Sequence, residues 1–132
     1  MSRWSEDFKV NVSAFDEQHK MLFSLIDDLD SRLKGDNQEE ISFIITELSA
    51  YALYHFAAEE RLLARFGFPG LVAHRSEHRE FEVKIYEFRS QFLNADPGLA
   101  LKVKEFLENW VSNHIKHTDK QYSQFFNSYG IN

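Results

Sequence analysis

The chain has 132 residues, of which 43% are hydrophobic and 15% aromatic, enough for one compact domain and too few for two ordinary catalytic domains. It contains no Cys, which excludes disulfides, iron–sulfur clusters, thiolate zinc sites and cysteine nucleophiles, so any bound metal must be held by nitrogen and oxygen atoms. A formal net charge of −6 disfavours binding to nucleic acids or anionic membranes. The six His remain to be explained.

The first fifteen residues show no long periodic pattern. We expect an extended arm there, anchored by Trp4, Phe8 or Val12. Residues 1–7 carry charges and lack the apolar run of a secretory signal, and no uncharged apolar run in the chain approaches transmembrane length. We therefore expect a cytoplasmic protein that does not contact membranes.

Two long helices are predicted next, because apolar residues recur at spacings of three and four, as is typical of a helix with one buried face. The first covers residues 16–34 and stops at Gly35. The second carries its apolar face over residues 41–66. Asn37, with Glu40 three residues later, predicts an N-cap and a capping box at its start.

The second half of the chain repeats this pattern. A third helix is predicted over residues 71–94, and Asp96–Pro97 predicts the cap and the first residue of a fourth helix, which ends near His117. A short amphiphilic helix over residues 119–127 follows, opened by a cap at Thr118.

Short connections between consecutive helices favour antiparallel neighbours. We therefore expect an all-α fold, an up-down-up-down four-helix bundle with an extended N-terminal arm and a short C-terminal helix. No internal repeat or low-complexity tract competes with this architecture. Residues 1–132 are expected to form a single domain.

Six polar residues lie on the helix faces that this bundle should bury: His19, His55, Glu59, His74, His78 and His114. A buried polar group costs several kcal/mol unless it is paired, and a buried carboxylate costs most. A single histidine in such a place is usually a hydrogen-bonded core residue. Five histidines on four converging helices instead favour a metal site.

The spacing of these residues supports this interpretation. His55 and Glu59 are four residues apart, as are His74 and His78, so each pair lies on one helix face with Cβ atoms about 6 Å apart. One pair alone would be weak support. Two pairs on neighbouring helices, with one histidine from each of the other two helices, predict a site for more than one ion.

Asp119 is a less obvious candidate. It follows His114 by five residues, which places it on the wrong side of an ideal α-helix to share a ligand. A break at Thr118 would turn Asp119 back toward the metals, but Asp119 could equally complement the dipole of the short helix. Three polar neighbours of the candidate ligands are expected at the surface: Tyr54, Glu60 and His117. Of these, His117 could also lie behind a ligand.

Two ions with octahedral preference could share Glu59 and Asp119 as bridges, together with a hydroxide. Five imidazoles would then complete the set and leave one position open, at the ion that holds two histidines instead of three. Nitrogen and oxygen donors without sulfur suit iron or manganese, whereas zinc rarely uses so many ligands.

Four runs of sequence contain all these candidates: Asp16-Glu17-Gln18-His19, His55-Phe56-Ala57-Ala58-Glu59-Glu60, His74-Arg75-Ser76-Glu77-His78 and Asn113-His114-Ile115-Lys116-His117-Thr118-Asp119. With these runs the chain resembles the hemerythrin family, specifically its single-domain bacterial members, along nearly its whole length. The resemblance implies a non-haem centre of two iron ions. His74, His78 and His114 would hold the closed iron. His19 and His55 would hold the open iron, with Glu59 and Asp119 bridging the two. His117 is a departure, because a small residue is expected there in many relatives.

The resemblance also implies reversible O2 binding at the open iron, for storage, delivery or sensing, and no enzymatic activity. A di-iron enzyme that uses the same open site, a peroxidase or nitric oxide reductase, is the alternative, and a structural or metal-buffering bundle is a third reading. O2 is the expected partner, with an oxygen-requiring enzyme as a candidate recipient, and the chain is expected to be a monomer. Four apolar residues are expected to line the O2 pocket: Val111, Leu22, Phe23 and Phe56.

Overall fold

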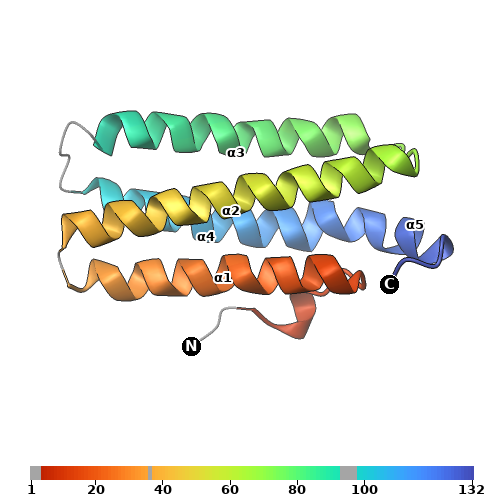
Figure 1. Ribbon diagram of the computed structural model, residues 1–132, viewed down its shortest axis with the longest axis horizontal. Coiled ribbons are helices and arrows are strands. Elements are labelled where there is room, and N and C mark those ends of the chain that lie inside the picture. Colours follow the sequence, from red (N-terminus) through yellow and green to blue (C-terminus); the bar gives the residue numbers. More distant parts are fainter. Residues whose placement is uncertain (1–3, 36, 93–97) are drawn as a thin grey trace.

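The computed structural model describes residues 4–35, 37–92 and 98–132, and these residues form helices and no strand. Four long helices run side by side: α1 (Ser13–Leu33), α2 (Gln38–Arg65), α3 (Leu71–Phe92) and α4 (Leu99–Asn113). Consecutive helices point in opposite directions along the long axis (Figure 1). The fold is therefore the up-down-up-down four-helix bundle that the sequence predicts.

The helix ends follow the local sequence. The Oδ1 atom of Asn37 accepts hydrogen bonds from the backbone N–H groups of Glu39 and Glu40 at 3.1 and 3.2 Å, which confirms the N-cap of α2. After α2, Gly67 adopts a φ of 70°, a conformation that glycine tolerates and that commonly ends a helix. The Asp96–Pro97 cap predicted for the fourth helix lies outside the described residues.

The N-terminal arm packs on the bundle instead of extending away from it. It contains one short 3-10 turn, η1 (Glu6–Phe8), and α1 then begins at Ser13, earlier than predicted. Buried Asp16 holds the arm against this helix, because its Oδ1 atom accepts a hydrogen bond from the N–H of Val10 at 2.7 Å. Of the three predicted anchors, Phe8 and Val12 are buried and Trp4 is partly buried; Val10, which was not predicted, is fully buried.

The C-terminal segment continues α4 as three short elements: a π-helical turn η2 (His114–Thr118), a 3-10 turn η3 (Asp119–Tyr122) and the helix α5 (Ser123–Ser128). The predicted break at Thr118 is wrong, because Thr118 has helical backbone angles and its side chain makes no capping hydrogen bond. The backbone N–H of Asp119 donates instead to the carbonyl of His114, five residues earlier. A π turn places residues five apart on one face, so His114 and Asp119 point the same way.

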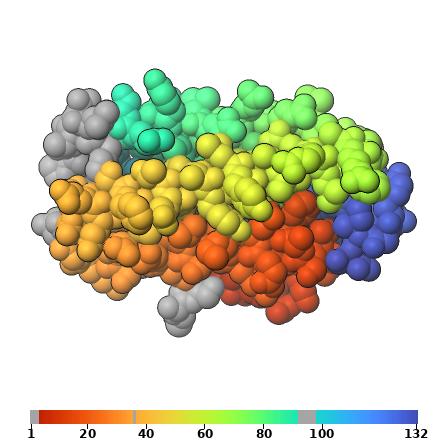
Figure 2. Space-filling view, in the orientation of Figure 1, coloured from red at the N-terminus to blue at the C-terminus, as the bar shows by residue number. Residues whose placement is uncertain are grey.

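Helix α2 is long and apolar enough to cross a membrane by length and composition, but 44% of the relevant window is buried inside the protein. The core helix of a soluble protein passes the same test. In Figure 2, α2 crosses the front of the molecule between α1 and α3. Its buried residues include Ile41, Leu48, His55 and Glu59, so α2 is a bundle helix that contributes both to the apolar core and to the polar cluster described next.

Candidate metal centre

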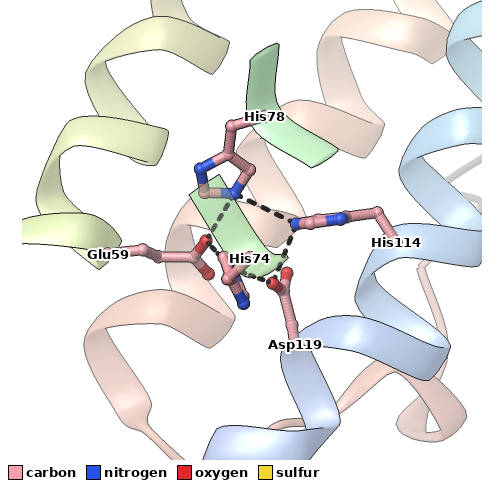
Figure 3. A group of neighbouring side chains, drawn as sticks. All are labelled: Glu59, His74, His78, His114 and Asp119. Carbon is pink, nitrogen blue, oxygen red and sulfur yellow. Dashed lines mark hydrogen bonds and ion pairs between the residues drawn. The ribbon is translucent and has the colours of Figure 1, made fainter. Parts of the chain in front are cut away.

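The seven polar residues that the sequence singles out lie together in the half of the bundle nearest α5. Each has at most 4% of its surface exposed. They come from α1, α2, α3 and the end of α4 with its continuation: His19, His55, Glu59, His74, His78, His114 and Asp119. Figure 3 shows five of them pointing toward a common centre, with Glu59 facing the two histidines of α3, and His114 and Asp119 entering from the opposite side.

The two oxygens of Glu59 face different sets of imidazoles. Its Oε2 atom lies 3.3 Å from Nε2 of His19 and 3.2 Å from Nε2 of His55. Its Oε1 atom lies 3.3 Å from Nε2 of His74 and 3.4 Å from Nε2 of His78. One carboxylate therefore stands between two groups of nitrogen donors, which is the position of a bridging ligand.

Asp119 divides its oxygens in the same way. Its Oδ2 atom lies 3.1 Å from Nε2 of His19, whereas its Oδ1 atom lies 3.0 Å from Nε2 of both His74 and His114. The π turn η2 makes this possible, since it brings Asp119 onto the face of His114.

The donor atoms of this cluster fit metal ions. Both Asp119 oxygens are buried without a hydrogen-bond partner among the described residues, and Nε2 of His78 lies 3.1 Å from Nε2 of His114. In the neutral forms that bind metal, these two imidazoles face each other through unprotonated nitrogens and have no donor between them. Metal ions satisfy all these acceptors at once. The ligand atoms form two groups that share the carboxylates, and within each group they lie within 4.8 Å of one another: Glu59, His74, His78, His114 and Asp119, and His19, His55, Glu59 and Asp119.

The outer nitrogens of three ligand histidines bind polar side chains that the sequence analysis does not identify as part of the site. Gln18 Oε1 contacts Nδ1 of His55, Glu60 Oε2 lies 2.8 Å from Nδ1 of His78, and Glu77 Oε1 lies 2.9 Å from Nδ1 of His114. The expectation that Glu60 is a surface residue is wrong, because it is half-buried and bonded to a ligand. These contacts fix each ring so that Nε2 faces the centre.

Tyr122 is a further residue that the sequence analysis misses. It is fully buried, and its hydroxyl donates a hydrogen bond to Oε2 of Glu59 at 2.6 Å. Burial and the charges of Glu59 and Asp119 raise the pKa of Tyr122 well above its usual value. Tyr122 is therefore a protonated donor that holds one oxygen of the shared carboxylate. Tyr122 follows Asp119 by three residues, a spacing that places two helical residues on one face, and this spacing could have identified it.

The electrostatics of the cluster without metal are dominated by the pairing of imidazoles with two buried carboxylates. Burial alone would lower the pKa of His19, but its close contacts with the carboxylates of Asp119 and Glu59 outweigh burial and raise the pKa to about 9. The same balance raises the pKa of His74 to about 10 and that of His114 to about 9. For His55, burial prevails and lowers the pKa.

The two carboxylates respond in the opposite direction. Burial would raise the pKa of Glu59, but the neighbouring histidines, His55 foremost, hold it well below the usual range. Burial and the charge of Glu59 would likewise raise the pKa of Asp119, yet His114 and His19 hold it well below its usual value. Both carboxylates are therefore ionised and available as ligands.

The residues expected to line an apolar pocket are all buried: Val111, Leu22, Phe23 and Phe56. The Phe56 ring stacks on the imidazole of His78 with centroids 3.9 Å apart and also packs edge-on against His114.

Two further residues were expected at the surface, and both are exposed. His117 is exposed, and Tyr54 is 61% exposed.

Fold and site together define a class of protein, a four-helix bundle that places two histidine groups around two shared, buried carboxylates suited to a pair of metal ions. The family described as "Hemerythrin HHE cation binding domain" matches residues 10–126. The chain belongs to the hemerythrin family.

Known proteins resemble the chain over most of its length. A bacteriohemerythrin from Pseudomonas aeruginosa is 32% identical over 119 residues, which cover 90% of this chain and 77% of that protein. A bacteriohemerythrin from Clostridium acetobutylicum is 30% identical over 124 residues, 90% of this chain and 96% of that protein. The crystal structure of a wild-type hemerythrin superimposes with a TM-score of 0.87 at 27% identity and covers 94% of this chain. Hemerythrins are known for binding O2 at a di-iron site and are not enzymes, and the cluster described above is compatible with such a site.

Proposed function

We propose that this chain, acting as a single hemerythrin domain over residues 1–132, binds O2 reversibly at a di-iron centre. The observation that carries the proposal is the division of two buried carboxylates between one group of three histidines and one group of two. A pair of bound iron ions would supply the reversible electron transfer to O2 that no side chain here can supply.

The proposed ligand sets follow from the distances. His74, His78 and His114, with one oxygen from each carboxylate, would hold one ion. His19 and His55, with the other two oxygens, would hold the second. The second set has one nitrogen donor fewer, so an ion held there would have a coordination position left for a small ligand. Its two histidines come from neighbouring helices, His19 from α1 and His55 from α2.

Reversible binding without further reaction is supported by the donor set and by the burial of the site. Five neutral imidazoles and two carboxylates form a centre with fewer anionic ligands than carboxylate-dominated di-iron sites have, and such a centre donates electrons less readily. The side chains of Leu22, Phe23, Phe56 and Val111 are at most 3% exposed. We propose that they exclude water and protons from the open position.

The role of the protein in the cell is proposed on the same basis. We infer that it stores or delivers O2 as a cytoplasmic monomer, with an oxygen-requiring enzyme as a candidate recipient. The net charge of −6 argues against nucleic acid or anionic membrane as a partner.

An oxygen-uptake measurement tests this function. Iron-loaded, chemically reduced protein, freed of excess reductant, should take up about one O2 for two irons and return it when the solution is purged with argon. His55→Ala, which removes one nitrogen from the proposed open position, should abolish the uptake. Continued consumption of O2 in the presence of an electron donor would instead indicate an enzyme.

A further inference from the structure

Three polar side chains bind ligand histidines, and each stands in sequence directly beside a ligand on the preceding helix. Gln18 precedes His19 on α1 and contacts His55 of α2. Glu60 follows Glu59 on α2 and contacts His78 of α3. Glu77 precedes His78 on α3 and contacts His114 at the end of α4. Neighbouring residues on a helix differ in direction by about 100°, so the residue on one side of an inward-facing ligand is turned toward the following helix, as these three are.

The three side chains differ in charge, and the charged ones contact the histidines of only one of the two metal positions. The two carboxylates, Glu60 and Glu77, both bind histidines of the three-histidine group. In the two-histidine group, His55 meets the neutral amide of Gln18, and Nδ1 of His19 is buried without a hydrogen-bond partner among the described residues. The outer hydrogen bonds of the two groups are therefore unequal.

Both carboxylates are themselves held in place. Glu60 Oε1 accepts a hydrogen bond from Nε of Arg75 at 2.9 Å. The Glu77 carboxylate accepts from the hydroxyl of Thr118, which lies 2.7 Å from Oε1 and 2.8 Å from Oε2. Thr118 is the last residue of the π turn η2. Each carboxylate is therefore fixed at the orientation that its histidine needs.

A histidine that donates its outer N–H to a carboxylate becomes a more basic metal ligand and is fixed as one tautomer, and the loss of such a partner typically costs 10–100-fold in metal affinity. A neutral amide fixes the tautomer but adds no charge. We propose that Glu60 and Glu77 are positioning residues that make the three-histidine position the tighter of the two, so that it fills first and the His19–His55 position fills second. This inference depends on the two-metal centre of the proposed function and not on O2 binding.

A titration of metal-free protein with Co2+ tests it, because the visible absorption of Co2+ reports each filled position. Wild-type protein should bind two ions in two steps. Glu60→Gln and Glu77→Gln keep an acceptor oxygen but remove the charge, and each should weaken the first step about 10-fold or more while leaving the second nearly unchanged. Glu17→Gln removes the same charge from a 70% exposed side chain that touches no ligand histidine, so it should titrate like wild type.

The reverse substitution separates an electronic role from a structural one. Gln18→Glu should tighten the second step, a gain that damage to the fold cannot produce. In a His55→Ala background only the three-histidine position is complete. There, Glu77→Gln should still weaken the binding of the single Co2+ ion about 10-fold.

The inference would be overturned if both glutamate variants bound Co2+ like the wild-type protein, or if both binding steps were weakened equally. Either result would leave the proposed function intact. Ordered Co2+ loading with the expected variant effects, in a protein that does not take up O2, would support the inference and refute the proposed function.

Discussion

Glu59 is fully buried, and its Oε2 atom lies within hydrogen-bonding reach of His19, His55 and the hydroxyl of Tyr122. A buried charge is tolerated only when its partners replace the water it has lost. At the scale of single residues, the site therefore depends on donors such as Tyr122 that are not themselves candidate ligands.

Replacement of Tyr122 by Phe removes one donor to this carboxylate and leaves the ring in place. We expect metal-free Tyr122→Phe to lose about 1.5–3 kcal/mol of unfolding free energy, the usual worth of a hydrogen bond to a charged group. Chemical denaturation measures the loss. Tyr129→Phe is the matched control, because Tyr129 is 56% exposed, and it should change the unfolding free energy little. An equal effect of both substitutions would contradict this role of Tyr122.

Val111 lies one helical turn before His114 and is 2% exposed. If it helps to exclude water from the open position, Val111→Ala should raise the autoxidation rate of the oxygenated protein several-fold. Val83→Ala makes the same change at a 58% exposed position and should leave the rate unaltered. If the Val111→Ala protein autoxidises at the wild-type rate, Val111 does not help to exclude water.

At the scale of elements, the π turn η2 decides whether Asp119 can be a ligand. Its five-residue hydrogen bond puts Asp119 on the face of His114, whereas an uninterrupted α-helix would turn it away. Insertion of one alanine after exposed His117 should place Asp119 six residues after His114 and rotate it, with all that follows, by about 100°. The variant should stay helical by circular dichroism but bind less than two metal ions per chain. His117→Ala, which keeps the chain length, should bind two. Two ions per chain in the insertion variant would contradict the account.

The sequence predicted the bundle and six of the candidate ligands because polar residues interrupt apolar stripes of helical period, whereas Asp119 was argued from a break at Thr118 and from the family resemblance. The sequence did not predict η2. A helix break at Thr118 and a π turn would both return Asp119 to the face of His114, and only the break has a recognised sequence signal. Glu60 and Glu77 were missed for a different reason. Each lies one residue from an inward-facing ligand and therefore resembles a surface residue, and its partner is on another helix that no local pattern identifies.

At the scale of the whole molecule, pH should affect the metal-free and metal-loaded proteins differently. The raised pKa values of His19, His74 and His114 mean that the metal-free folded chain binds protons more tightly there than the unfolded chain does. This stabilisation is complete below pH 6.5 and is lost as the pH rises to about 9–10. The lowered pKa values of Glu59 and Asp119 act in the opposite sense, stabilising the fold above about pH 4.5 and losing that effect in acid.

The lowered pKa of His55 acts against the three raised histidines but does not cancel them, so we expect the unfolding free energy of metal-free protein to be highest between about pH 4.5 and 6.5 and to fall on both sides. Metal ions bind neutral imidazoles, so loading at pH 7.5 should release protons into a weakly buffered solution, and the alkaline loss of stability should shrink once metal is bound. Denaturation curves over a pH series and an indicator dye measure the two effects. Proton uptake on loading would contradict the assigned electrostatics.

The most direct test of the central claim is the visible spectrum of aerobically purified protein, recorded together with its metal content through repeated cycles of oxygen removal and return. The account predicts about two irons per chain and an absorption band that disappears under argon and returns in air with little loss over several cycles. A band that bleaches irreversibly in the first cycle, or a chain that holds no iron, would contradict reversible O2 binding at a di-iron centre.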